Sequence, residues 1–320
     1  AYKNTLAAVY SSNVKKELFY TRARKYASTM EAHLDNYHIP TSVYTQLIDT
    51  VHSFLPSMYR YVSLRKKLLG VDELHMYDVY TPIIEYHSPE IPFEEAKSIV
   101  LEGLAPLGED YIKLLKEGFD NRWIDIYENQ GKRSGAYSTC VYGAHPYVLL
   151  NYQGNLDNVF TLAHEMGHSL HSCYTNANQT YINSNYNIFV AEIASTCNEY
   201  LLISHLMKKA ESKDEKAYLL NHLMDQFKGT LFRQTMFAEF ELMAHEHAEK
   251  GESLTREWLC ETYGGLNKKY YGEAVETDEL ISLSTTTLPS LSKCQSISSG
   301  AFIPEYSFTF KPAALYRYWV

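Results

Sequence analysis

The sequence has few cysteines, no long apolar segment and no excess of basic residues. No run reaches about 18 consecutive apolar residues, so the pattern excludes a transmembrane helix and predicts no membrane partner. The five cysteines are odd in number, widely spaced and without a CxxC pair, which favours a reduced, cytoplasmic protein over a disulfide-stapled one. The net charge of −9 argues against nucleic acid as a partner.

Two further absences concern the organisation of the chain. The first ten residues, AYKNTLAAVY, lack an initiator Met and the basic and apolar regions of a secretory signal, so we expect a fragment or a processed product. No internal repeat occurs at a period of about 20–50 residues, which disfavours a solenoid. The length of 320 residues, of which 45% are hydrophobic, allows one or two domains with a real core.

Tyrosine is abundant, with 28 residues, and histidine is frequent, with 13. The tyrosine side chain combines a flat apolar body with a polar tip, so it suits half-exposed helix surfaces as well as wet, hydroxyl-lined grooves. Composition alone favours helix packing over a groove.

Hydrophobic periodicity predicts a mainly α fold with one small β-sheet just ahead of the helix that carries the main motif. Thr41 and Gly70 are the expected N-cap and end of one long helix. The predicted helices are 12–34, 41–69, a pair from residue 92 interrupted near Pro106, 155–174, 187–210, 215–249 and 254–270, and the predicted strands are 135–142 and 147–152.

The strongest motif is the HExxH pattern of His164, Glu165 and His168. Two histidines four residues apart project from one helix face, where both imidazoles reach one metal ion. Glu165 lies beside them and places a carboxylate next to a metal-activated water. Asn155 is a suitable N-cap for this helix, and Asp157 suits the positive end of its dipole. The alternative is a helix with chance histidines, which would bury both imidazoles without a partner.

A catalytic zinc needs a third protein ligand. The metzincin spacing is excluded because the required Gly and His positions hold His171 and Tyr174. We interpret His171 as a residue of the pocket behind the ligands. The next helix carries Glu192 and Glu199, seven residues apart and so on one face, and from spacing alone either one can ligate the metal.

HEMGHSLHS followed by FVAEIASTCNEYLL resembles the oligoendopeptidase F branch of the thimet-type (M3) zinc oligopeptidases. The stretches GVDELHMYDVYTP, WIDIYENQGKRSGAYS, HPYVLLNYQG and LFRQTMFAEFE are also similar to that branch, and the likeness covers about residues 1–280. It implies a zincin-type helical catalytic domain that holds one Zn²⁺ per chain through His164, His168 and Glu192. It also implies Glu165 as general base and Glu199 as the carboxylate that orients a ligand histidine.

The resemblance further implies an endopeptidase for short, unstructured oligopeptides. The stretch GAYSTCVYG offers an edge to an extended peptide, with Ala136, Tyr137, His145 and Tyr147 as predicted substrate-binding residues. For His145 and Tyr147 the alternative is packing within the turn and the strand. The sequence does not indicate an oligomeric state.

The C-terminal part departs from the pattern of that family. Residues 281–320 hold 12 Ser or Thr and only 4 charged residues, and no His follows His247. We expect an atypical tail in place of the family's His- and Tyr-bearing C-terminal segment, with a frameshift as the hypothesis for its origin. We also expect the family's N-terminal lobe to be missing. The second functional hypothesis is therefore a truncated, catalytically impaired zinc- or peptide-binding fragment. A second cluster, His245-Glu246-His247, is interpreted as a solvated helix end.

Overall fold

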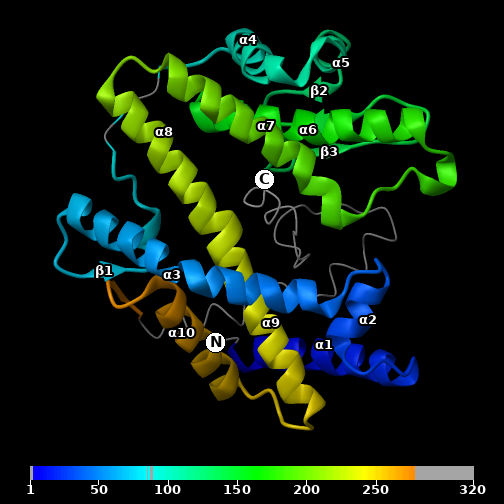
Figure 1. Cartoon of the computed structure of the whole chain (residues 1–320), viewed down its shortest axis with the longest axis vertical. Coiled ribbons are helices and arrows are strands. Elements are labelled where there is room, and N and C mark those ends of the chain that lie inside the picture. Colours follow the sequence, from blue (N-terminus) through cyan, green and yellow to red (C-terminus); the bar gives the residue numbers. More distant parts are fainter. Residues whose placement is uncertain (1–2, 85, 87–88, 278–320) are drawn as a thin grey trace. The chain divides into compact units, whose positions relative to one another are not determined.

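The computed structural model describes residues 3–84, 86 and 89–277. It is mostly helical, which confirms the predicted fold class (Figure 1). The predicted tail, 281–320, lies outside the described residues. The described residues divide into two compact units, the first formed by those up to Ile83 and by 224–277, the second by those between. Within the described part, no helix is both long and apolar enough to cross a membrane.

The first unit is a helical assembly with one pair of very short strands. The predicted helix over 12–34 is in fact two helices. The chain turns at Lys25, which adopts a positive φ of 66°, and Ser28 then caps the second helix by accepting a hydrogen bond from the Glu31 amide at 3.0 Å. The helices of this unit are α1 (Lys3–Ala23), α2 (Thr29–Asp35), α3 (Thr41–Leu69), α9 (Arg233–Glu249) and α10 (Arg256–Tyr271).

Helix α3 has the predicted length, and Gly70 ends it in the left-handed region at a φ of 67°. Its N-cap is Pro40 rather than the predicted Thr41, which is the first helical residue. The periodic apolar residues of α3 are buried against α9 and α10. Strand β1 (Leu74–His75) follows α3 and pairs in parallel with β5 (Val275–Glu276).

The interpretation of His245 as part of a solvated helix end is wrong. His245 lies on α9 and is only 6% exposed, with its Nε2 3.4 Å from Oε2 of Glu17 on α1. His247 stacks on Trp258 at 4.2 Å between ring centroids. Both rings therefore pack against neighbouring helices, because α9 contacts α1, which carries Glu17, and α10, which carries Trp258.

The second unit contains α4 (Phe93–Leu104), α5 (Glu109–Asp120), α6 (Leu156–Asn178), α7 (Ile188–Lys209) and most of α8 (Lys213–Gln226). A 3-10 turn at Ala105–Leu107 separates α4 from α5, where the sequence predicts an interruption. Helices α6 and α7 lie side by side (Figure 1) and share the most extensive helix contact of the unit. The core between the helices is filled by Val159, Leu162, Ala163, Met166, Leu170 and Leu202, all fully buried.

The sheet of the second unit has three strands in the order β2 (Ile124–Asp125), β4 (Tyr147–Leu149), β3 (Tyr137–Thr139). Strand β3 is antiparallel to β4, as the predicted hairpin requires, and it forms one edge of the described sheet. The sequence missed β2, which is two residues long and parallel to β4, because so short a strand carries no alternation.

The predicted helix over 215–249 is confirmed as a continuous helical path with a local irregularity. Helix α8 passes into a π-helical turn, Phe227–Phe232, and then into α9. The turn directs Lys228 inward, where its Nζ donates to the Asp225 carboxylate at 2.6 Å and to the Val79 carbonyl at 2.7 Å. This buried cation is a tertiary feature that helical periodicity does not reveal.

Candidate metal centre

The two histidines of the HExxH motif face one another across a single turn of α6. The helix starts where predicted, because the Asn155 side chain accepts a hydrogen bond from the Asn158 amide at 2.9 Å. The Nε2 atoms of His164 and His168 lie 3.1 Å apart, with their rings at 82°. Four-residue spacing on a helix thus brings both donor atoms to one point.

Glu192, in the second turn of α7, completes the group. Its Oε2 lies 3.3 Å from Nε2 of His164 and 3.5 Å from Nε2 of His168. In the part of the chain that the structure describes, these three residues form a group whose ligand atoms all lie within 4.8 Å of one another. Of the two carboxylates that the spacing left open, Glu192 is the one that faces both imidazoles, while Glu199 pairs with His164 alone among the interactions described.

The three ligand atoms have the spacing that zinc requires. Donor atoms about 2.0–2.1 Å from a tetrahedral zinc ion lie about 3.3–3.4 Å from one another. The observed separations of 3.1, 3.3 and 3.5 Å match that value without any rearrangement. Two imidazoles and one carboxylate are also a ligand set of catalytic zinc sites, so the residues present fit the ion.

Glu199, two turns further along α7, lies on the other side of His164. Its Oε1 pairs with Nδ1 of His164, so that Nδ1 carries the proton and Nε2 is left to face Glu192 and His168. Burial lowers the pKa of His164, but hydrogen bonds and charge from Glu192 and Glu199 outweigh burial and raise it to about 10. The site therefore favours a positive charge between its two carboxylates, which is a second respect in which it suits a cation.

The general base predicted from the motif, Glu165, is 7% exposed and lies on α6 beside His164. Its backbone carbonyl accepts a hydrogen bond from the Ser169 hydroxyl at 2.9 Å. Burial raises the pKa of Tyr186, the residue two positions before α7; its hydrogen bond with Ser172 lowers that pKa, and the charges of Glu192 and Glu165 add to the rise. Sequence reasoning missed Tyr186, because one tyrosine among 28 carries no distinguishing signal.

His171, which the sequence places in the pocket behind the ligands, does not join the three-ligand group. It stacks on the Tyr186 ring, with centroids 3.8 Å apart and the planes at 13°. Burial, followed by the charge of His168, lowers its pKa. The structure thus places His171 one turn after His168, against the segment that leads into α7.

Close approach of α6 and α7 brings the two carboxylates to the histidines. A Cβ atom at Gly167 would lie 2.6 Å from the Ser195 Cα and 2.9 Å from the Ala194 carbonyl oxygen, so only glycine permits this crossing. Asn198 of α7 stabilises the contact between the two helices, because its side-chain amide donates to the Ala163 carbonyl of α6 at 2.9 Å. Gly167, the variable position just before the second histidine of HExxH, therefore has a structural role: it lets α7 approach α6 closely.

Strand β3 lies along α6 next to the metal centre. The hydroxyl oxygens of Ser138 on β3 and Ser169 on α6 are 2.8 Å apart, and Ser169 is the residue that follows His168. Tyr137, predicted to bind substrate, is part of this edge strand and is half-buried. Strand β3 is thus an edge strand of the described sheet that contacts the helix of the two histidines.

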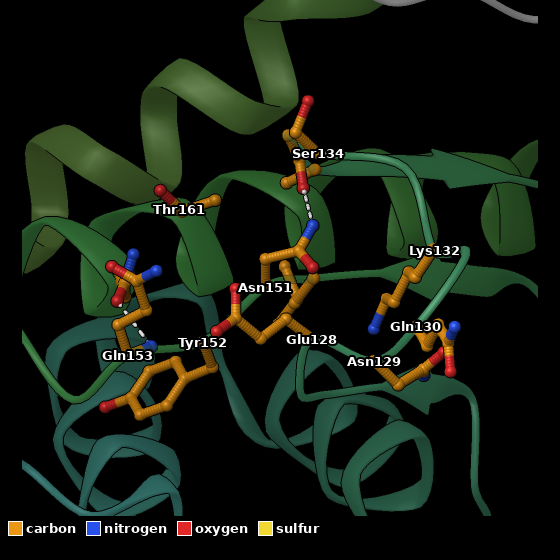
Figure 2. A pocket seen from close by; sticks show the side chains of 13 residues that line it. Glu128, Asn129, Gln130, Lys132, Ser134, Asn151, Tyr152, Gln153 and Thr161 are labelled. Carbon is orange, nitrogen blue, oxygen red and sulfur yellow. Dashed lines mark hydrogen bonds between the residues drawn. The ribbon is translucent and has the colours of Figure 1, made fainter.

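Ala136, the residue just before β3, lines a pocket of about 730 Å³ at the end of the sheet. Figure 2 shows Asn151 in the middle of its wall, with Thr161 of α6 on one side and Lys132 on the other. Carboxamide and hydroxyl side chains dominate the lining, which consists of Glu128, Asn129, Gln130, Lys132, Ser134, Gly135, Ala136, Leu150, Asn151, Tyr152, Gln153, Asn158 and Thr161.

The last two predicted substrate residues pack against each other. His145 stacks flat on Trp123 at 5.6 Å and contacts Tyr147 at 4.4 Å between centroids. Tyr147 lies on β4 and is 50% exposed. The structure brings His145 and Tyr147 together where the turn between the strands meets β4, in the arrangement that the packing alternative describes.

Comparisons with known proteins agree on one family. The sequence profile described as Peptidase family M3 matches residues 1–294. The chain is 51% identical over 288 residues to oligopeptidase PepF of Bacillus subtilis, which covers 90% of this chain and 43% of that protein. It is 45% identical over 289 residues to the chromosomal oligoendopeptidase F of Lactococcus lactis subsp. cremoris, covering 90% of this chain and 48% of that one.

The fold agrees with a solved structure. The crystal structure of oligoendopeptidase F from Enterococcus faecium superposes with a TM-score of 0.67 at 41% identity, covering 89% of this chain and 44% of that one. The chain thus spans about half the length of the relatives that it matches.

Proposed function

The chain belongs to peptidase family M3, and from this membership and the geometry of the metal centre we propose that it is a zinc-dependent endopeptidase. The observation that carries the proposal is the triangle of His164, His168 and Glu192, whose ligand atoms have the mutual distances of a tetrahedral zinc site. One Zn²⁺ per chain would be held by these three side chains.

Bound zinc supplies Lewis acidity, lowering the pKa of a water to about 7 and polarising the scissile carbonyl. The protein side chains do the rest. Glu165 accepts the proton of the attacking water and delivers it to the leaving amine, as a buried carboxylate beside the ligands can. Glu199 holds the His164 ring in the tautomer that leaves Nε2 free for the metal.

Short, unstructured peptides are the substrate class that we propose. Two relatives are named oligopeptidase and oligoendopeptidase, and β3, an edge strand in contact with the helix of the two histidines, suits pairing with an extended backbone. Tyr137 on that strand and Ala136 just before it remain the proposed substrate contacts. His145 and Tyr147 also remain proposed substrate contacts. They would contact a residue of the peptide that reaches the exposed face of Tyr147. The proposed location is the cytoplasm, because the four described cysteines are all free thiols.

The test is cleavage of an internally quenched oligopeptide by the purified, zinc-loaded chain. We expect Glu165→Gln to lower turnover about 10²–10⁴-fold, the usual contribution of a general base, while the zinc content stays at one per chain. Glu246→Gln, an exposed residue of α9, is the matched control and should leave turnover unchanged.

Zinc content and turnover together decide between the two functional hypotheses. Bound zinc without turnover would support the second hypothesis, an impaired zinc- or peptide-binding fragment. A chain that binds no zinc would overturn both hypotheses.

A further inference from the structure

The carboxylate of Glu192 is held in place by a hydroxyl from its own helix. The Ser195 Oγ lies 3.0 Å from Glu192 Oε2, which is the same oxygen that faces both imidazoles. Ser195 is completely buried. A carboxylate oxygen has two lone pairs, so Oε2 can accept from Ser195 and still face the metal position.

The hydroxyl has a second possible acceptor, the Glu192 carbonyl oxygen, also at 3.0 Å. That carbonyl is already engaged, because the Thr196 hydroxyl donates to it at 2.6 Å and the helix amide four residues on donates to it as well. A carbonyl oxygen has two lone pairs. The charged carboxylate is therefore the stronger acceptor left to Ser195.

The position of Ser195 is fixed independently of its hydroxyl. Its Cα sits at the crossing of α6 and α7, where a Cβ on Gly167 would come within 2.6 Å. The backbone of Ser195 thus cannot shift towards α6, and the hydroxyl projects from a rigid point. A buried Glu side chain otherwise loses much of its rotamer freedom when one conformation is selected.

We propose that Ser195 is a positioning residue that pre-orders the Glu192 carboxylate for the metal ion. The inference rests on the proposed zinc site and goes beyond it, because it assigns a role to a residue that touches neither the metal position nor a substrate. The Ser195 hydroxyl selects the one carboxylate orientation in which Oε2 faces both histidines, so that metal binding does not have to order the side chain.

The experiment measures Zn²⁺ affinity of the full metal-free chain by competition with a chromophoric chelator. Ser195→Ala removes the hydroxyl and adds no bulk, and we expect affinity to fall about 10–100-fold, as for other residues that orient ligands. Thr196→Val is the matched control: it removes the adjacent buried hydroxyl, which contacts only backbone carbonyls, and should change affinity less than about threefold.

A double-mutant cycle shows whether Ser195 acts through Glu192. In a Glu192→Ala background, Ser195→Ala should have no further effect on Zn²⁺ affinity. The absorption spectrum of the Co²⁺-loaded protein gives a second readout, which we expect to change in Ser195→Ala and not in Thr196→Val. Because this spectrum reports the coordination geometry, a loss of helix stability alone would leave it unaltered in whatever fraction remains folded.

The outcomes separate this inference from the proposed function. If the wild-type chain binds no zinc, the proposed function fails and the role of Ser195 fails with it. If the wild type binds zinc and Ser195→Ala binds it equally well, or if Thr196→Val loses as much affinity, only the role of Ser195 is overturned.

Discussion

At the scale of single residues, His164 shows how one hydrogen bond decides which ring nitrogen is available. Nδ1 is engaged by Glu199, which directs Nε2 towards Glu192 and His168. Without Glu199 the ring can adopt either tautomer and rotate. We therefore expect Glu199 to contribute to metal affinity without facing the proposed metal position.

Replacing Glu199 by Gln tests this role. The amide no longer stabilises the required tautomer or the charge on His164, so we expect Zn²⁺ affinity to fall about 10–100-fold, measured by chelator competition. Glu211→Gln, an exposed residue just beyond α7, is the control and should retain wild-type affinity. An unchanged affinity in Glu199→Gln would contradict the orienting role.

At the scale of elements, the metal centre depends on how closely two helices approach. Gly167 makes the α6–α7 crossing possible, and Asn198 and the buried apolar residues maintain it. The ligand triangle is therefore a property of the helix pair, because α6 supplies two donor atoms and α7 the third.

Gly167→Ala should separate the two helices. The added methyl group would overlap the backbone of α7, and we expect a loss of about 1–3 kcal/mol in unfolding free energy, together with weaker Zn²⁺ binding. The same change at Gly265 on α10 meets nothing within 4 Å and should stabilise the helix by about 0.5–1 kcal/mol. Denaturant unfolding of both variants checks the opposite signs; equal effects would refute the close-approach argument.

In the first unit, Glu239 joins three helices. Its carboxylate accepts from Tyr270 of α10 at 2.7 Å, and it pairs with His52 of α3 at 2.7 Å and with Lys269 at 2.9 Å. Burial raises the pKa of Glu239, but these three hydrogen bonds outweigh burial and hold it below the ordinary value. An acid with a lowered pKa stabilises the fold above its unfolded-state pKa, and that stabilisation disappears as pH falls through the folded-state pKa.

Glu239→Gln should therefore cost about 1–3 kcal/mol at pH 7, and the difference from wild type should shrink as pH falls below about 4.5. Thermal melts between neutral and acidic pH measure this convergence. Glu246→Gln on the same helix is exposed and should follow the wild-type curve throughout. A difference that stays constant with pH would show that the ionised carboxylate is not what stabilises these helices.

At the scale of the whole molecule, the described chain consists of two compact units, and all three ligands lie in the second. A ligand that binds only the folded state stabilises the part of the structure that holds it. Zinc should therefore act on the helices that carry its ligands and leave the core of the first unit unaffected.

Hydrogen exchange followed by mass spectrometry distinguishes the two units. Adding Zn²⁺ to the metal-free chain should slow amide exchange in α6 and α7 and leave α3, α9 and α10 unchanged. Removing the ion with EDTA should reverse the effect. Equal protection across both units would show that zinc stabilises the molecule as a whole.

Local signals in the sequence were sufficient for several parts of this protein. The N-cap Asn155 and the end of α3 at Gly70 follow from residue chemistry, and the structure confirms both. These predictions succeeded because each depends on residues within one turn of one another. Helical spacing alone also puts His164 and His168 on one face of α6, where their Nε2 atoms lie 3.1 Å apart.

The remaining features depend on contacts between distant segments. Spacing alone could not separate Glu192 from Glu199, since both carboxylates share one helix face; the family resemblance implied Glu192, and the α6–α7 crossing decides which nitrogen of His164 each carboxylate faces. The burial of His245 needed α1, more than two hundred residues away in the chain. Sequence periodicity states which face of a helix is apolar but not which partner covers it, and that partner decides whether a polar side chain becomes a ligand, an orienting group or part of the core.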